Sequence, residues 1–225
     1  MMKTRFFFLL VLLLTGCTQT DTLSNDNESA EPNTLTNTAF TSTDVASEYS
    51  SAYDNAYEMQ IFMHEDLSTL TFEGTGNEFA SYQVKTNWLS ANLVRQVVDN
   101  GGSIMTRYYR VGEHGITLIK EVENENTPLT AEQLKGLPSI STLIGSPLEV
   151  GQKFDNWTIE KMNMPYETPY KAFEHVMVTM KNENNQTMRN YFVAGIGLVA
   201  TEFEILNEDG TSDVISSKLK SIEFQ

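Results

Sequence analysis

The chain has 225 residues, a formal net charge of −15 at pH 7 and a single cysteine. An acidic surface of this kind repels phosphate backbones, so nucleic acid is not expected among the partners. One cysteine excludes an intrachain disulfide, so the core must hold by packing alone, and the length predicts one domain or at most two small ones.

Residues 1–16 have the features of a secretory signal peptide. Lys3 and Arg5 form a cationic start, and an unbroken apolar run follows at residues 6–14. The run is too short to cross a bilayer as a helix, which needs about 20 apolar residues. The segment therefore predicts secretion through the general export route.

The only cysteine, Cys17, lies directly after this segment. Residues 14–17 read LTGC and resemble the lipobox of bacterial lipoproteins. The resemblance implies that the sulfur of Cys17 receives a diacylglyceryl group, that cleavage occurs before Cys17, and that the outer face of the cell membrane holds the protein. Two acyl chains give a durable anchor, because each buried methylene contributes roughly 0.8 kcal/mol. The alternative is an ordinary signal peptide followed by a chance cysteine.

Residues 17–56 are predicted to be a disordered tether with a short helix. Thr, Ser, Asn, Asp and Glu dominate residues 18–44, which therefore cannot bury enough apolar area to offset the entropy of ordering. Tyr49, Tyr53 and Tyr57 recur every four residues, as on one face of a helix that docks its tyrosines on the domain. A carbohydrate-stacking stripe is the alternative. Residues 57–225 are expected to form a single domain.

The first half of this domain alternates apolar and polar residues. Tyr82, Val84, Thr86 and Trp88 share one face of residues 81–89, which is typical of a half-buried strand. Further strands are expected at 92–98, 103–111 and 116–122, with turns at 100–102 and 112–115. Residues 123–147 are interrupted by prolines and predict a long connection, in which 130–133 fit a helix capping box.

The second half predicts strands at 157–162, 172–181, 188–193, 198–206 and 214–222, with turns at 182–185 and 208–210. Residues 194–197 read AGIG and predict a tight turn or a bulge; they are not a phosphate cradle, because a strand and not a helix follows. The spacing of the strands predicts an all-β fold, a single antiparallel meander rolled into a sandwich or a partly closed barrel, with a short helical segment.

Four stretches resemble a group of uncharacterised Gram-positive extracytoplasmic lipoproteins: FEGTGNEFASYQVK from Phe72, SPLEVGQKF from Ser146, ETPYKAFEHVMVT from Glu167 and RNYFVAGIGLVATEF from Arg189. In that group a PL-VG strand start precedes a tryptophan strand, and a TP-G-(Y/F) turn and a YYA-GVGLVK hairpin follow. This chain departs from the group at Tyr170, where the group has a small residue, and at Ala200, where a lysine is common. The resemblance implies a lipobox and an all-β domain, and it brings no activity.

The three histidines are too far apart in sequence to form a metal-ligand motif. Glu65 and Asp66 follow His64, and a solvated acidic turn is favoured there over a metal site. His175 is expected to be partly buried or to lie on an edge strand, and His114 lies in a glycine-flanked turn. No metal ligand is therefore predicted.

No catalytic residue or cofactor-binding residue is predicted either. With Cys17 acylated no thiol nucleophile remains, and the sequence has no GxSxG elbow. Residues 207–213 lack the alternating ligands of a calcium loop and are expected to be a hairpin turn.

Three hypotheses for function follow. The first is a monomeric, lipid-anchored binding or interaction module without enzymatic activity, whose partner is a cell-wall component or a protein. The second is a carrier that holds a lipid or a small apolar ligand in the concave face of the sheet. The third is a cell-wall hydrolase with paired carboxylates. Whether the concave face is packed, hollow or grooved separates them.

Overall fold

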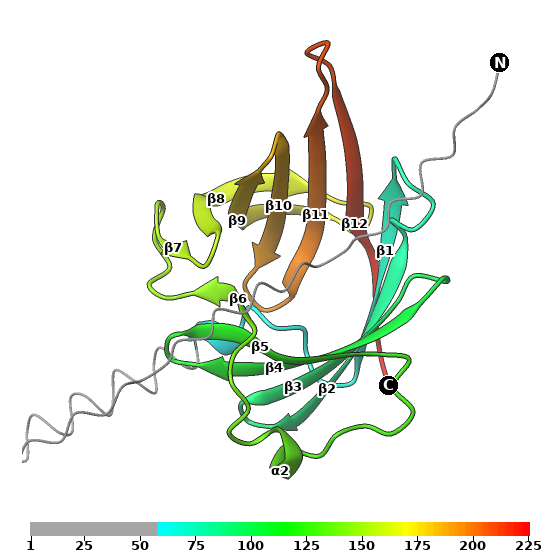
Figure 1. Ribbon diagram of the computed structural model, residues 1–225, viewed down its shortest axis with the longest axis vertical. Helices are drawn as coiled ribbons and strands as arrows, with labels where there is room; N and C mark the ends of the chain where they lie inside the picture. The colour runs from blue at the N-terminus through cyan, green and yellow to red at the C-terminus, as the bar shows by residue number, and fades with distance from the viewer. Residues whose placement is uncertain (1–57) are drawn as a thin grey trace, which may run out of the picture. The chain divides into compact units, whose positions relative to one another are not determined.

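The computed structural model describes residues 58–225, so the predicted signal peptide, Cys17 and the tether lie outside the described residues. Twelve antiparallel strands form one sheet, in the order β6-β5-β4-β3-β2-β1-β12-β11-β10-β9-β8-β7. The sheet curls into a nearly closed barrel (Figure 1). The predicted all-β meander is therefore confirmed, in its barrel form.

The bounds of the elements are as follows. The strands are β1 (Ser68–Thr75), β2 (Tyr82–Ser90), β3 (Leu93–Asp99), β4 (Ile104–Gly112), β5 (Gly115–Glu123), β6 (Ser141–Gly145), β7 (Lys153–Phe154), β8 (Trp157–Glu167), β9 (Ala172–Glu183), β10 (Gln186–Val193), β11 (Gly197–Leu206) and β12 (Ser212–Phe224). The helix α2 covers Ala131–Leu134.

The barrel has one hydrogen-bonded joint and one loose seam. β1 and β12 pair from Ser68↔Phe224 to Thr75↔Ser216 and so join the half made of β1–β6 to the half made of β7–β12. On the other side β6 and β7 lie next to each other without strand pairing in the described residues. Among the contacts between the two sides, the amide of Thr142 donates to Oδ2 of Asp155 at 2.6 Å, and Ile144 of β6 and Phe154 of β7 belong to the same hydrophobic cluster. Figure 1 shows the two halves facing each other.

All the predicted strands are present, as β2–β5 and β8–β12. The inward face of β2 is the predicted one, since Val84 and Thr86 are buried and Lys85 is exposed. The predicted capping box also forms: the side chain of Thr130 accepts from the amide of Gln133, whose side chain accepts from the amide of Thr130. The strands β1, β6 and β7 were not predicted, and β6 lies within what was predicted to be a long connection.

Residues 58–67 precede β1 and cover one end of the barrel; we call them the plug segment. Residues 58–60 are helical, and Tyr49, Tyr53 and Tyr57 of the predicted helix lie outside the described residues. Met59, Phe62 and Met63 are buried in the largest hydrophobic cluster, together with side chains of both barrel halves. Burying a side chain of this size contributes roughly 1.5–3 kcal/mol, so the plug segment is part of the core.

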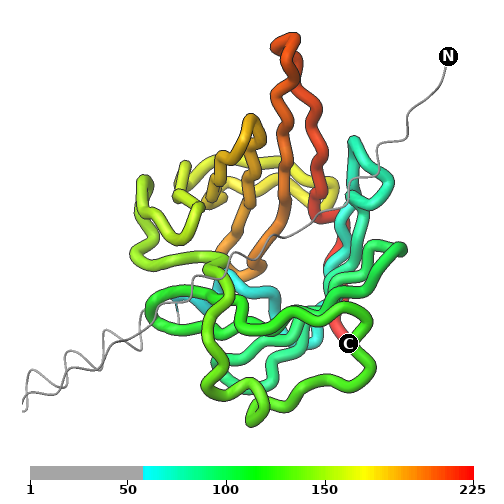
Figure 2. Tube along the Cα trace, in the orientation of Figure 1, coloured from blue at the N-terminus to red at the C-terminus, as the bar shows by residue number. Residues whose placement is uncertain are grey.

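The two ends of the barrel differ. At the plug end the strands are joined by the β2–β3 turn and the β10–β11 turn, which both contact the plug segment. At the open end lie the turns that join β3 to β4, β9 to β10 and β11 to β12. Figure 2 shows the β11–β12 hairpin extending beyond its neighbours at this end.

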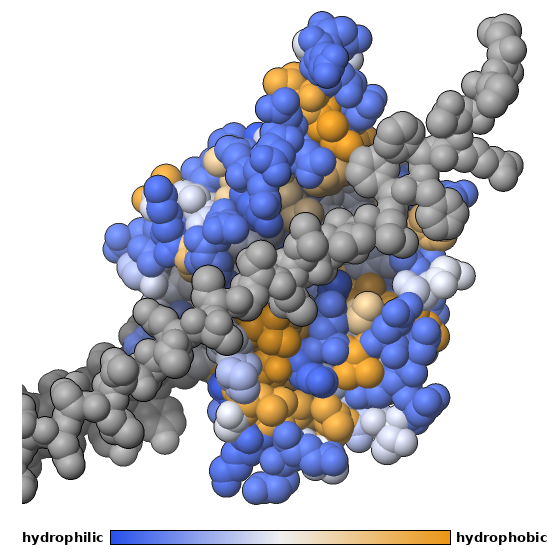
Figure 3. All heavy atoms as spheres, viewed as in Figure 1, coloured by the Kyte–Doolittle hydropathy of each residue, from blue (hydrophilic) through white to orange (hydrophobic). Residues whose placement is uncertain are grey.

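The outer part of the β11–β12 hairpin carries hydrophobic side chains below a hydrophilic tip (Figure 3). Leu206 and Val214 are each about half exposed there.

The remaining helical element, α2, packs Leu134 onto Tyr108 and Ile119. No helix within residues 58–225 is long and apolar enough to cross a membrane.

Candidate functional site: a cavity inside the barrel

A cavity of about 370 Å³ lies on the concave face of the sheet. Its lining comes from the plug segment, from the strands of both barrel halves and from β6. The lining residues are Phe62, Met63, His64, Tyr82, Val84, Gln96, Val98, Arg107, Tyr109, Leu143, Met188, Asn190, Phe192, Leu198 and Thr201. The concave face is therefore hollow.

His64 lies at the plug end of the cavity and is only 3% exposed. Its Nε2 lies 3.1 Å from the carbonyl oxygen of Leu198 and must donate to it, whereas its Nδ1 lies 3.2 Å from the side-chain nitrogen of Gln96 and must accept. Burial lowers the pKa of His64 from 6.5 to about 4, and the bond to Leu198 opposes that change only in part. The imidazole is therefore neutral at pH 7.

The prediction of a solvated acidic turn at residues 64–66 is thus wrong for His64 and right for its two neighbours. Glu65 and Asp66 are exposed, whereas His64 points inward. The physical reason is the set of contacts that hold the plug segment: Nε1 of Trp88 donates to the carbonyl of His64 at 3.0 Å, and the amide of Trp88 donates to the carboxylate of Asp66 at 2.8 Å. These contacts join distant parts of the chain, so no local pattern reports them.

The predicted tight turn at residues 194–197 joins β10 to β11 and receives the plug segment. The amide of Gly195 donates to the carbonyl of Ile61 at 2.7 Å. Gly197 has a φ of +95°, and a Cβ built on it would lie 2.9 Å from the carbonyl oxygen of Phe62. Glycine at 197 therefore permits both the turn and the close approach of the plug segment.

Arg107 projects from β4 into the cavity lining. Its Nε donates to Oε2 of Glu121 at 2.6 Å, and the two side chains are 40% and 38% exposed. Beside it, burial raises the pKa of Tyr109, and the positive charge of Arg107 offsets this in part. Since His64 is neutral, Arg107 carries the one full charge among the described lining residues.

Asn190 is a buried polar side chain without a partner in the described residues. The residue is 8% exposed, and its side-chain amide makes no hydrogen bond within the described residues. Its amide atoms are not fully buried, so they can still be reached from the cavity. The amide therefore has free hydrogen-bonding capacity toward the cavity, which it lines. The cavity combines such polar groups with apolar walls, and no carboxylate is among its described lining residues.

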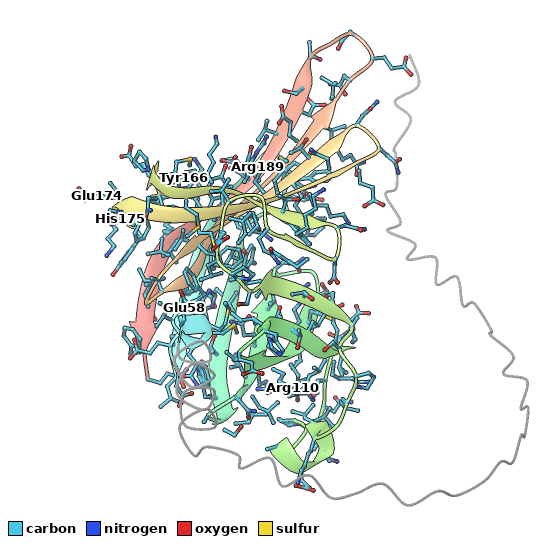
Figure 4. All side chains as sticks on the ribbon, turned by 90° about the vertical axis from the view of Figure 1, so that its left-hand side faces the viewer. Glu58, Arg110, Tyr166, Glu174, His175 and Arg189 are labelled. Atoms are coloured by element: carbon cyan, nitrogen blue, oxygen red, sulfur yellow. The ribbon has the colours of Figure 1, made fainter. Side chains whose placement is uncertain are left out.

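The other two histidines lie away from this cavity. His175 is exposed although β9 is an interior strand, so the expectation of a partly buried or edge position is wrong. β9 has a bulge at this point: between the paired positions it carries two residues, Glu174 and His175, where β8 carries one. The side chains of Glu174 and His175 both project outward (Figure 4). His114 is exposed and contacts Glu113 at 3.1 Å. No group of three or more potential metal ligands is present in residues 58–225.

A polar cluster that the sequence did not indicate lies on β8, β10 and β11. The hydroxyls of Tyr166 and Tyr191 donate to the two carboxylate oxygens of Glu202 at 2.8 and 2.5 Å, and their rings stack at 4.1 Å. Arg189, near Tyr166 in Figure 4, bonds to Glu160 and to another β11 carboxylate. Every member has a partner, so the cluster is a structural brace.

The two departures from the lipoprotein pattern fit this fold. The amide of Tyr170 donates to the carbonyl of Leu219 at 3.0 Å, and its side chain is 42% exposed, so a large residue fits the β8–β9 turn. Ala200 is completely buried and pairs with Tyr191 and Lys218 on its two sides.

A second hollow, of about 510 Å³, runs along the plug segment beside Trp88 and Gly195. Its two acids are Glu65 and Asp66. Asp66 already accepts from the amides of Leu67 and Trp88, so its carboxylate positions the plug segment.

No family model and no curated protein matches the chain. Among solved structures, the crystal structure of "a putative exported protein with YmcC-like fold" from Bacteroides fragilis NCTC 9343 is similar, with a TM-score of 0.43 and 12% sequence identity. The match covers 72% of this chain and 98% of that chain.

Proposed function

We propose that the protein is a lipid-anchored, extracytoplasmic binding protein that holds a small amphipathic ligand in the barrel cavity. The signal peptide and the lipobox at Cys17 support the location, and the resemblance to Gram-positive lipoproteins agrees with it. This proposal combines the first two hypotheses from the sequence, the lipid-anchored binding module and the ligand carrier. It differs from the second in that the ligand is partly polar.

The cavity is the observation that carries the proposal. Its volume of about 370 Å³ falls within the range of small-molecule sites, which is roughly 300–1,000 Å³. Ligand sites are mostly apolar with a few placed polar groups, and here Arg107 and Asn190 stand among apolar side chains of both halves. The amide of Asn190 makes no hydrogen bond within the described residues and lines this hollow, which is how a polar group that binds a ligand would be placed.

The hydrolase hypothesis has less support. Glycoside hydrolysis needs two carboxyl groups that flank the bond to be cleaved. The described lining of the cavity contains no carboxylate. The acid pair beside the plug segment includes Asp66, whose Oδ1 accepts from two backbone amides and so holds the plug segment.

The anchor is tested by replacing Cys17. Cells fed an alkyne-bearing fatty acid are expected to label the wild-type chain in the membrane fraction, and Cys17→Ser is expected to abolish both the label and the membrane association. Persistent membrane association of the unlabelled variant would show that another element holds the protein.

The cavity is tested with prodan, a neutral amphiphilic dye, and the full chain carrying Cys17→Ser, which has no acyl group of its own to occupy the site. The dye is expected to bind once per chain with a blue-shifted emission. Val98→Trp, which fills the cavity, is expected to abolish binding, whereas Val150→Trp, at a position 64% exposed, is expected to leave it unchanged. Equal binding by the two variants would refute the cavity as the site.

A further inference from the structure

We infer that the ligand of the cavity is an acidic amphiphile, whose carboxylate or phosphate binds Arg107 and whose apolar body points toward the plug segment. The inference rests on the proposed function and adds the chemical class of the ligand. It follows from the charge, the hydrogen-bonding geometry and the positions of the lining residues along the strands.

The charge of the cavity favours an anion. Arg107 carries the one full charge of the described lining, in a chain whose formal net charge is −15. A charge that is partly withdrawn from water needs a counter-charge, and Glu121 supplies one only from the rim, since it is not a lining residue. A ligand anion inside the cavity would complete this neutralisation.

The guanidinium of Arg107 also has N–H donors that do not bond to Glu121. Glu121 bonds to Nε through one oxygen, and no other carboxylate in the described residues contacts Arg107. A guanidinium has five N–H donors in a planar fork, so the Nη groups can bind a carboxylate or a phosphate through two parallel bonds. The phenol of Tyr109, which already forms a hydrogen bond with Arg107, and the amide of Asn190 also line the cavity and can donate to such a group.

The strand registers set the direction of the ligand. Arg107 lies three residues from Ile104, where β4 begins at the open end of the barrel. Phe192 and Leu198 lie next to the β10–β11 turn, at the plug end, where Phe62 and Met63 also line the cavity. The acidic group would therefore face the open end, and the apolar body would fill the closed end.

The experiment compares three ligands that share one alkyl chain: decanoate, decyl phosphate and decanol. Isothermal titration calorimetry uses the full chain carrying Cys17→Ser. Either acid is expected to bind roughly tenfold to a hundredfold more tightly than decanol, as expected for charge-assisted hydrogen bonds. Whichever acid binds more tightly identifies the source class, a fatty acid or a phosphate ester.

Variants assign the effect to Arg107. Arg107→Gln is expected to remove the preference for the acids and to leave decanol binding within about twofold. Arg189→Gln, a matched control in an ion-paired cluster away from the cavity, is expected to keep the preference. Glu121→Gln removes the negative charge that competes for the guanidinium and is expected to tighten acid binding. Because this position is exposed, the variant keeps the test open if Arg107→Gln does not fold.

The outcomes separate the inference from the proposed function. Equal affinity for decanol and both acids, or a preference that neither Arg107→Gln nor Glu121→Gln changes, would overturn the inference and leave the binding function intact. Binding of prodan without binding of any of the three ligands would overturn the inference as well. If prodan also fails to bind, the proposed function falls.

Discussion

A Cβ atom built on Gly197 would lie 2.8 Å from Cδ2 of His64. The β10–β11 turn and the plug segment therefore meet at a point where no side chain fits between them. Because His64 lines the cavity, this contact fixes the position of one of its lining residues.

Gly197→Ala is expected to lower the free energy of unfolding by about 3 kcal/mol, through backbone strain and overpacking against the plug segment. Gly195→Ala is the matched control, since its φ is also positive but nothing lies within 4 Å of its added Cβ, and it is expected to cost about 1 kcal/mol. Urea unfolding measures both. Equal losses would show that the contact with His64 adds nothing.

His64 is expected to make the fold sensitive to acid. Its pKa is 6.5 in the unfolded chain and about 4 in the folded one, so between these values the unfolded chain binds more protons. The contribution of His64 is complete above pH 6.5 and falls by about 3 kcal/mol as the pH drops through 4.

Urea unfolding at pH 7.5 and pH 4.5 tests this dependence. His64→Gln is expected to show a smaller loss between the two pH values than the wild-type protein, since carboxylates contribute to both. The exposed His114→Gln is expected to match the wild type. An unchanged loss in His64→Gln would mean that protonation of this residue does not limit stability in acid.

Thr179→Val is expected to stabilise the protein by about 1 kcal/mol. Thr179 is completely buried and its hydroxyl has no partner in the described residues, so valine of similar shape removes an unpaired polar group. Thr86→Val is the control, because the hydroxyl of Thr86 accepts from Gln96 and its loss is expected to destabilise. Thermal unfolding compares the two, and a destabilised Thr179→Val would indicate a partner for that hydroxyl.

Tyr166 and Tyr191 are expected to ionise well above the ordinary tyrosine pKa of 10.0. Burial raises both pKa values, and the hydrogen bonds to Glu202 and its charge raise them further. Because the folded state holds these protons longer than the unfolded chain does, stability is complete below pH 10 and is lost as the pH rises above it.

Phenolate absorbance in an alkaline titration measures these ionisations. Glu202→Gln is expected to bring the pKa values of Tyr166 and Tyr191 closer to 10.0, whereas Glu183→Gln, in an ion pair with Lys181, is expected to leave the curve unchanged. A curve that is the same for both variants would show that Glu202 does not hold the phenol protons.

The strands were predictable because inward and outward positions alternate locally, as in β2 with Val84 buried and Lys85 exposed. The bulge at Glu174 and His175 broke that rule, and β7, with two residues, is too short to show a period. The cavity depends on which residues of the two halves face each other. Arg107 and Asn190 come from strands that share no hydrogen bonds, so their meeting in one lining follows from the curvature of the whole sheet.

The pairing of β1 with β12 has a consequence for how the barrel assembles. The other ladders join strands that follow one another in the chain, and apart from the longer β5–β6 connection their loops are short. The β1–β12 ladder joins the two ends of the described chain, from Ser68↔Phe224 onward, and its loop-closure entropy is the largest of all. The hairpins of each half are therefore expected to form before the two halves dock along this ladder, and docking is expected to limit the rate of folding.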